Sequence, residues 1–93
     1  MNVNVTTAGA LSRSLPGGRT VVEGDDLTVA RVLEALVARY GPGMAQELME
    51  RSRLREGLAL LVNGRNVLSL PERFETLLRD GDEILIAIMV AGG

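Results

Sequence analysis

The chain has 93 residues, a length that allows one small domain with a single core. It is 46% hydrophobic and 24% charged, as in globular proteins. Nucleic-acid binding needs a basic face and stacking rings, and a chain with a net charge of −2, one Tyr and one Phe offers little of either. The sequence contains no cysteine, histidine or lysine, which excludes disulfides, the usual zinc sites, histidine-activated nucleophiles, phosphate-loop lysines and Schiff-base catalysis.

The first two predicted elements are strands. Val3 and Val5 alternate with polar residues, which predicts a half-buried strand over residues 2–7. The stretch SLPGGR at 14–19 has the composition of a turn, and the β-branched stretch 20–23 follows it. A second strand is therefore expected to return antiparallel to the first.

A helix is predicted from the next segment. Thr28 is placed to cap its first turn, and Gly41-Pro42 is placed to end it. Asp25 and Asp26 precede the cap, near the positive end of the helix dipole. A continuous apolar stripe with helical spacing supports this interpretation, formed by Val29, Val32, Leu33, Leu36, Val37 and Tyr40.

A shorter helix is expected from Met44 to about Arg51, with Met44 and Leu48 facing the core. The stretch RSRLRE then places Arg51, Arg53 and Arg55 close together. We interpret these arginines as a solvated surface loop, with a docking site for an acidic partner or RNA as the alternative.

The remaining sequence predicts a hairpin and a final strand. Asn63-Gly64 between the stretches LALLV at 58–62 and RNVL at 65–68 is the signal for a type I′ turn, in which both central residues have positive φ. Phe74, Leu77 and Leu78 are expected to cover an edge of the core. Asp80-Gly81-Asp82 then turns the chain into a strand over residues 83–89, the most apolar segment of the protein.

These elements occur in the order β, β, α, β, β, β. A strand that is apolar on both faces usually lies in the middle of a sheet, so the last strand is expected to lie beside the first. The predicted fold is α+β, with a mixed sheet of about five strands packed on one main helix and the first and last strands adjacent and central. We expect one domain over residues 1–93, with a flexible tail at about 90–93.

No membrane or targeting signal is present in the sequence. The longest apolar run, residues 84–91, has the length of a strand, and the opening MNVNVTT lacks the basic and apolar regions of a signal peptide. We therefore expect no membrane partner and a cytoplasmic location.

Several of these segments together resemble the β-grasp proteins related to ubiquitin, and among them the sulfur carriers of the molybdopterin synthase small subunit and ThiS type. The resemblance rests on the MNVNV strand, the helix start at Thr28-Val29, the VNGR hairpin, the LRDGDEI stretch and the terminal VAGG. The terminal VAGG after the DGDE turn is the most specific of these. Ile88 and Met89 depart from the proline or aromatic residue that many sulfur carriers have before VAGG, which leaves the pathway open.

The resemblance implies a function for the end of the sequence. The carboxylate of Gly93 would be adenylated with ATP by an enzyme of the ubiquitin-activating type and converted to a thiocarboxylate that donates sulfur, with molybdopterin synthesis as the favoured pathway. Gly92, Ala91, Val90, Met89 and Ile88 would form the tail and the partner-binding segment. Implied partners are the adenylating enzyme, a catalytic subunit such as the large subunit of molybdopterin synthase, and a sulfur donor such as a cysteine desulfurase system.

Other functions stay open at this stage. The chain could be a ubiquitin-like modifier joined to lysines of other proteins, a sulfur carrier for thiamin, cysteine or tRNA thiolation, or a non-covalent interaction module. An autonomous enzyme is not expected, because the two carboxylate clusters, residues 25–26 and 80–83, occupy positions where helix starts and turns ordinarily use acids. We therefore expect no metal site and no bound cofactor, and ATP would be used by the activating partner.

The outward face of the last strand is a further candidate for partner binding. Whichever set points away from the helix, Ile84, Ile86 and Ile88 or Leu85, Ala87 and Met89, is apolar. Members of the resembled family dock partner enzymes through the sheet face near the tail. The alternative is that the second helix or a loop covers this face.

Overall fold

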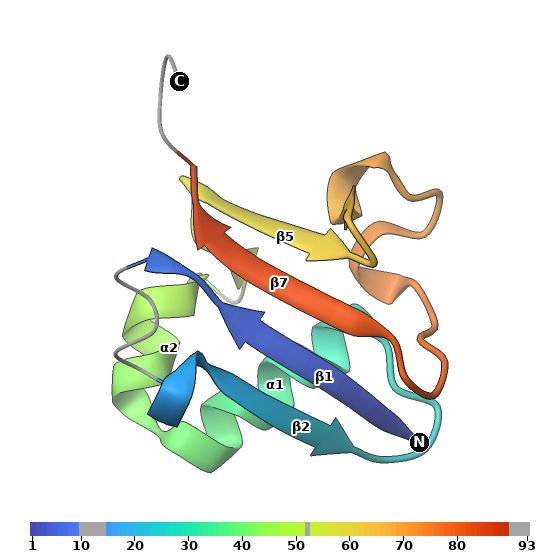
Figure 1. The fold of residues 1–93 in the computed structure, drawn as a ribbon. Helices are drawn as coiled ribbons and strands as arrows, with labels where there is room; N and C mark the ends of the chain where they lie inside the picture. The colour runs from blue at the N-terminus through green and yellow to red at the C-terminus, as the bar shows by residue number, and fades with distance from the viewer. Residues whose placement is uncertain (10–14, 52, 90–93) are drawn as a thin grey trace.

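A computed structural model describes residues 1–9, 15–51 and 53–89 of the chain. The main helix and the strands of the main sheet follow the predicted order (Figure 1). The strands of the main sheet are β1 (Asn2–Thr7), β2 (Arg19–Glu23), β5 (Leu58–Val62), β6 (Arg65–Asn66) and β7 (Glu83–Ile88). The helices are α1 (Val29–Tyr40) and α2 (Pro42–Leu48), with short 3-10 helices η2 (Pro16–Gly18), η3 (Val67–Ser69) and η4 (Arg73–Glu75).

The five strands form one mixed sheet in the order β2-β1-β7-β5-β6. β7 runs parallel to β1 and antiparallel to β5, while β1 and β2 are antiparallel. The first and last strands are therefore adjacent and central, as predicted. Both helices lie on one side of the sheet, behind it in the view of Figure 1. This is the β-grasp arrangement that the sequence indicated.

Helix α1 begins and ends where the local signals predict. The Oγ1 of Thr28 accepts a hydrogen bond from the backbone N–H of Arg31 at 3.2 Å, which satisfies one of the donors left free at a helix start. Gly41 follows the helix with a φ of 82°, and its N–H donates to the carbonyl of Val37. Four residues of the predicted stripe are buried against the sheet, namely Val29, Val32, Leu33 and Leu36.

Replacing Thr28 with Ala is expected to lower the free energy of unfolding by about 1 kcal/mol, because the cap bond to Arg31 is lost. Urea unfolding of the variant measures this loss. Thr28→Ser is the matched control, since serine keeps the hydroxyl oxygen. If the alanine variant is as stable as the parent chain, the cap contributes nothing.

The region between α2 and β5 differs from the expected helix. α2 ends at Leu48 rather than near Arg51, and residues Met49–Glu50 (β3) and Arg53–Leu54 (β4) pair as a separate two-stranded sheet. Met44 and Leu48 are buried, as predicted. Arg51 has a φ of 52°, so the chain turns there instead of continuing a helix.

The hairpin after β5 is confirmed but is shorter than predicted. Asn63 and Gly64 have φ values of 49° and 84°, the positive pair of a type I′ turn. β6 contains two residues because Val67 leaves the sheet to begin η3, where the Oδ1 of Asn66 accepts a hydrogen bond from the N–H of Leu68 at 2.9 Å. The predicted strand over 65–68 is therefore wrong in its second half.

The core lies between the sheet and the two helices, and one expected member is missing from it. Leu78 is buried and Phe74 is half-buried, but Leu77 is 61% exposed. Leu77 forms an isolated bridge with Thr28 in an extended segment, where neighbouring side chains point to opposite sides, so Leu77 faces out while Leu78 faces in. In the described part of the chain, no helix has both the length and the apolarity to cross a membrane.

Candidate functional site

The predicted site begins at the end of β7. Ile88 is the last residue of this strand and is 48% exposed, and Met89 follows it at 54% exposed. The other predicted site residues, Val90, Ala91, Gly92 and Gly93, lie outside the described residues. The structure therefore describes Ile88 and Met89, from which the tail starts, and we call these two residues the base of the tail.

Hydrogen bonds from neighbouring strands hold this base. Met89 donates its N–H to the carbonyl of Gly57 at 2.7 Å, and Ile88 pairs with Leu58 of β5. On the other side of β7, Ala8 donates its N–H to the carbonyl of Ile86 at 3.0 Å. Strands on both sides of β7 thus fix the direction in which the chain leaves the sheet.

The two faces of β7 have different surroundings. Ile84 and Ile86 point into the core and are buried. Leu85 and Ala87 point to the opposite face, where both helices are absent (Figure 1), and are half-buried. The sequence left two possible outward sets, and the structure selects Leu85 and Ala87. The second helix does not cover this face, because α2 lies with α1 on the other side of the sheet.

The apolar outer surface extends from β7 onto β5. In the register of the sheet, Leu61 lies opposite Leu85 and Ala59 lies opposite Ala87. We call the surface formed by Leu61, Leu85, Ala59 and Ala87 the outer apolar patch. The β5 members were not predicted, although the stretch 58–62 is apolar at every position, which indicates a strand with an apolar residue on each face.

Polar residues limit the outer apolar patch on the side of β1. Asn4 and Thr6 lie on the face of β1 opposite to the buried Val3 and Val5. Thr6 is in register with Leu85. Asn4 and Thr6 therefore separate the outer apolar patch from Val21, which is exposed on β2, and the patch lies on the half of the sheet that also carries the base of the tail. An apolar patch beside such a tail is typical of a docking surface.

The acidic cluster before β7 has a structural role. Asp80 accepts a hydrogen bond from the N–H of Asn2 at 2.7 Å, and Asp82 accepts one from the N–H of Arg79 at 2.7 Å. The second carboxylate oxygen of Asp82 accepts a hydrogen bond from the side chain of Asn63 at 3.0 Å. These bonds tie the turn before β7 to β1 and to the hairpin, as expected for acids in turns.

Comparison with known proteins identifies the family. The model of the ThiS family matches residues 10–93. A protein of Archaeoglobus fulgidus named as a sulfur carrier is 34% identical over 83 residues, which cover 89% of this chain and 93% of that protein. The chain belongs to the ThiS family. Proteins of this family are small ubiquitin-like sulfur carriers.

Solved structures agree with this membership in the ThiS family. The small archaeal modifier protein 1 of Methanosarcina acetivorans is 30% identical, with a TM-score of 0.83 over 99% of this chain and 96% of that one. A chain of the Amycolatopsis orientalis BexX/CysO complex is 27% identical, with a TM-score of 0.73 over 98% of this chain and 99% of that one. Both similarities extend over nearly the full length of each chain, so the whole ThiS-type fold is shared.

Proposed function

We propose that this ThiS-family protein carries sulfur as a thiocarboxylate on Gly93. The observation that carries the proposal is the family match, which continues through residue 93. The fold supports it, because Gly93 follows closely after a central strand whose end is held by two hydrogen bonds, from the N–H of Met89 to the carbonyl of Gly57 and from the N–H of Ala8 to the carbonyl of Ile86. No reactive side chain of this protein is needed for the chemistry.

The reaction that we propose has two steps. A carboxylate oxygen of Gly93 attacks the α-phosphorus of ATP and releases pyrophosphate, which gives an acyl adenylate. Hydrosulfide supplied by the donor system then attacks the acyl carbon, AMP leaves with the electrons of the broken C–O bond, and loss of the sulfur-bound proton gives the thiocarboxylate. Activation is required because a carboxylate has a poor leaving group, whereas the mixed anhydride with AMP has a good one. ATP and the groups that bind it belong to the activating partner.

The two glycines suit this role for a steric reason. A terminal carboxylate reaches a buried active site only if the last residues thread a narrow channel. Glycine has no Cβ, so its backbone can approach the walls of such a channel closely. Gly92 and Gly93 therefore provide access for the carboxylate.

Sulfur carriers of this type work with partner enzymes, and a relative has been solved in the BexX/CysO complex. We propose that the outer apolar patch, together with Ile88 and Met89, docks the activating enzyme. These residues lie on or beside the strand that carries the tail, so a partner bound there would receive Gly93 in its active site. A sulfur donor and a sulfur-accepting catalytic subunit complete the proposed set of partners.

Met89→Asp is expected to weaken binding to the activating enzyme roughly tenfold or more, since it places a charge in an apolar contact. The melting temperature should change little, because Met89 is 54% exposed. Calorimetric titration of the variant with the enzyme measures the effect. Leu77→Asp is the matched control, an equally exposed apolar residue outside the patch. Equal loss of binding in both variants would contradict the proposed surface.

Molybdopterin synthesis is the pathway that we propose for the sulfur, with a large catalytic subunit as the acceptor. The length of the chain between α1 and β5 supports this choice, because it provides α2 (Pro42–Leu48) and the strands Met49–Glu50 and Arg53–Leu54 in addition to the main helix and sheet. Thiolation of thiamin precursors, cysteine or tRNA is the alternative use of the same thiocarboxylate. Reconstitution with each acceptor in turn distinguishes these pathways.

A second candidate function is protein modification. The similarity to a protein named as a small archaeal modifier favours it. In this case the activated Gly93 would form an isopeptide bond with a lysine of another protein. The chain has no lysine, so it could extend a polymer of itself only through its N-terminal amine. Glycine remnants on lysines of cellular proteins would identify this function.

The intact mass of the protein purified from its native host tests the proposal directly. An increase that corresponds to replacement of one oxygen by sulfur, localised to Gly93 by fragmentation, is the expected result. Incubation with ATP and the candidate activating enzymes should also give an adenylate on Gly93. An unmodified terminus together with no adenylate formation would overturn the carrier function.

A further inference from the structure

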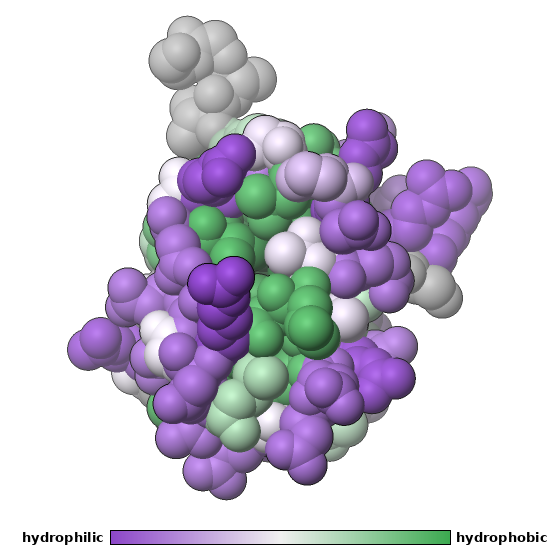
Figure 2. Space-filling view, turned by 90° about the vertical axis from the view of Figure 1, so that its right-hand side faces the viewer, coloured by the Kyte–Doolittle hydropathy of each residue, from purple (hydrophilic) through white to green (hydrophobic). Residues whose placement is uncertain are grey.

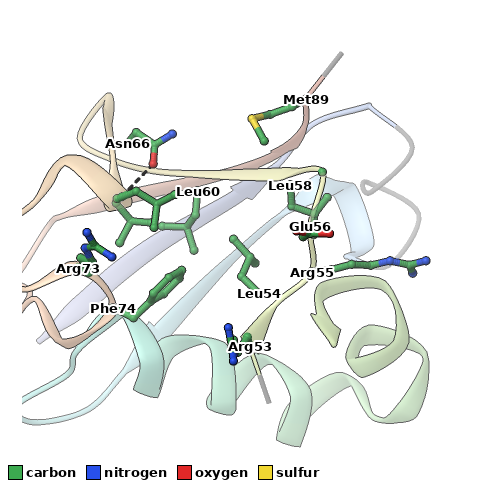
Figure 3. Close-up of a pocket in the computed structure, with 13 residues that line it drawn as sticks. Arg53, Leu54, Arg55, Glu56, Leu58, Leu60, Asn66, Arg73, Phe74 and Met89 are labelled. Carbon is green, nitrogen blue, oxygen red and sulfur yellow. Dashed lines mark hydrogen bonds between the residues drawn. The ribbon is translucent and has the colours of Figure 1, made fainter. Parts of the chain in front are cut away.

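A groove runs along the edge of β5, on the side of the molecule that carries η3 and η4. Its volume is about 720 Å³, within the range of ligand-binding pockets. Leu54 of β4, Leu58 of β5 and Phe74 of η4 form its apolar lining, and Met89 lies at one end (Figure 3). Figure 2 shows apolar side chains gathered in a band between hydrophilic ones on this side of the molecule.

The groove exists because distant segments meet there. β4 brings Leu54 beside the sheet, and η4 brings Phe74 from the connection that leads to β7. Leu54, Leu58 and Phe74 pack against the core but are only half-buried, so part of each apolar surface remains accessible. The groove therefore presents an apolar floor that no other described residue covers.

Positive charge flanks this floor on two sides. Arg53 lies on β4, next to Leu54, and Arg73 lies on η4, next to Phe74 (Figure 3). Both side chains are exposed, and neither guanidinium has a hydrogen bond or ion pair within residues 1–9, 15–51 and 53–89. Arg55 points away toward α2, where it donates a hydrogen bond to the carbonyl of Gln46 at 3.1 Å. Among the described residues of the lining, Glu56 is the one acidic residue.

We propose that this groove binds an acidic peptide segment of a partner protein. An apolar side chain of the peptide lies on Leu54, Leu58 and Phe74, while carboxylates on either side of it pair with Arg53 and Arg73. Guanidinium groups bind carboxylates through paired hydrogen bonds, and the two arginines here pair with no carboxylate among the residues that the structure describes. The contacts of the peptide in this proposal are with Leu54, Leu58, Phe74 and the two arginines, and none of them involves Gly93.

A peptide fits these features better than a nucleic acid does. A nucleic acid carries a negative charge at every phosphate. Phosphates beyond the two arginines would therefore lie against a protein whose net charge is −2, which disfavours binding. Binding of single strands also relies on several aromatic side chains, whereas Phe74 is the one aromatic residue in the described lining of this groove. A short acidic peptide supplies both the apolar anchor and a limited number of carboxylates.

The test uses the full chain and two synthetic peptides. The first has a central leucine flanked by aspartates and glutamates, and the second has asparagines and glutamines in their place. Fluorescence anisotropy of the dye-labelled peptides measures affinity, and amide chemical shifts of the labelled protein locate the site. We expect the acidic peptide to bind more tightly, to weaken as salt is added, and to shift amides of residues 53–60 and 73–75.

Arg53→Gln and Arg73→Gln are each expected to weaken binding of the acidic peptide roughly two- to fivefold, and the double variant roughly tenfold. Both side chains are exposed, so the melting temperature should be unchanged. Arg31→Gln, which removes an exposed arginine of α1 outside the groove, is the matched control and should bind as the parent chain does.

Three results would overturn the proposal. Equal affinity for the acidic and neutral peptides would show that the arginines do not recognise carboxylates. Shifts confined to the outer apolar patch would place the peptide elsewhere. Tighter binding of an RNA oligonucleotide than of the acidic peptide, lost in the Arg53→Gln and Arg73→Gln variants, would assign the groove to nucleic acid instead.

Discussion

A chain that lacks Gly93 is expected to fold normally and to fail as a substrate for adenylation. An extended residue spans about 3.5 Å, so the deletion draws the terminal carboxylate back by that length from the activating site. A misplacement of about 1 Å can already cost roughly a hundredfold in rate, so we expect a loss of at least that size. Pyrophosphate release in the presence of ATP and the activating enzyme measures it.

Single substitutions refine this test of the tail. Gly93→Val adds a branched side chain next to the reacting carboxylate and is expected to block adenylation as the deletion does. Gly43→Ala is the control, because an added Cβ at Gly43 meets no atom within 4 Å. Circular dichroism should show unchanged melting temperatures for the tail variants. Normal adenylation of the Gly93 deletion or of Gly93→Val would refute the role of Gly93.

Ile86→Ala is expected to lower the free energy of unfolding by about 3 kcal/mol, within the range of about 2–5 kcal/mol for such truncations in a core. Ile86 is 0% exposed and lies on the central strand, in register with Thr7 of β1 and Leu60 of β5. Its truncation leaves a cavity between the sheet and the helices. For a domain of this size, the loss is a large part of the total stability.

Urea unfolding measures this loss, and Ile88→Ala is the control on the same strand. Ile88 is 48% exposed, so its truncation removes less buried surface and should cost less than about 1 kcal/mol. Equal losses at positions 86 and 88 would mean that Ile88 is as deeply packed as Ile86. A small loss at position 86 would place Ile86 outside the core.

The sequence alone was sufficient wherever the signal is local. Thr28 and Gly41 mark the ends of α1 because capping depends on residues within one turn of the helix end. Asn63-Gly64 predicts its turn because few residues adopt positive φ at low cost. The strand order also followed, since a strand that is apolar on both faces, as β7 is, usually lies in the middle of a sheet.

Predictions failed where short segments depend on distant partners. β3 and β4 have two residues each, too few for a periodic pattern, and they exist only because they pair with each other. Leu77 has the composition of a core residue, but the extended backbone at its bridge with Thr28 directs it outward. The sequence alone does not show whether such a side chain points into the core or toward solvent.

The same division applies to function. The sequence by itself determined the ThiS-type character and the glycine tail, because the final residues and the elements before them lie in one continuous stretch that can be read without a fold. Only the tertiary structure decided that Leu85 and Ala87, rather than Ile84 and Ile86, face outward, since burial depends on which side of the sheet the helices cover. The groove also follows from the tertiary structure alone, because Arg73 and Phe74 are distant from Arg53 and Leu54 in the sequence and only folding places them side by side.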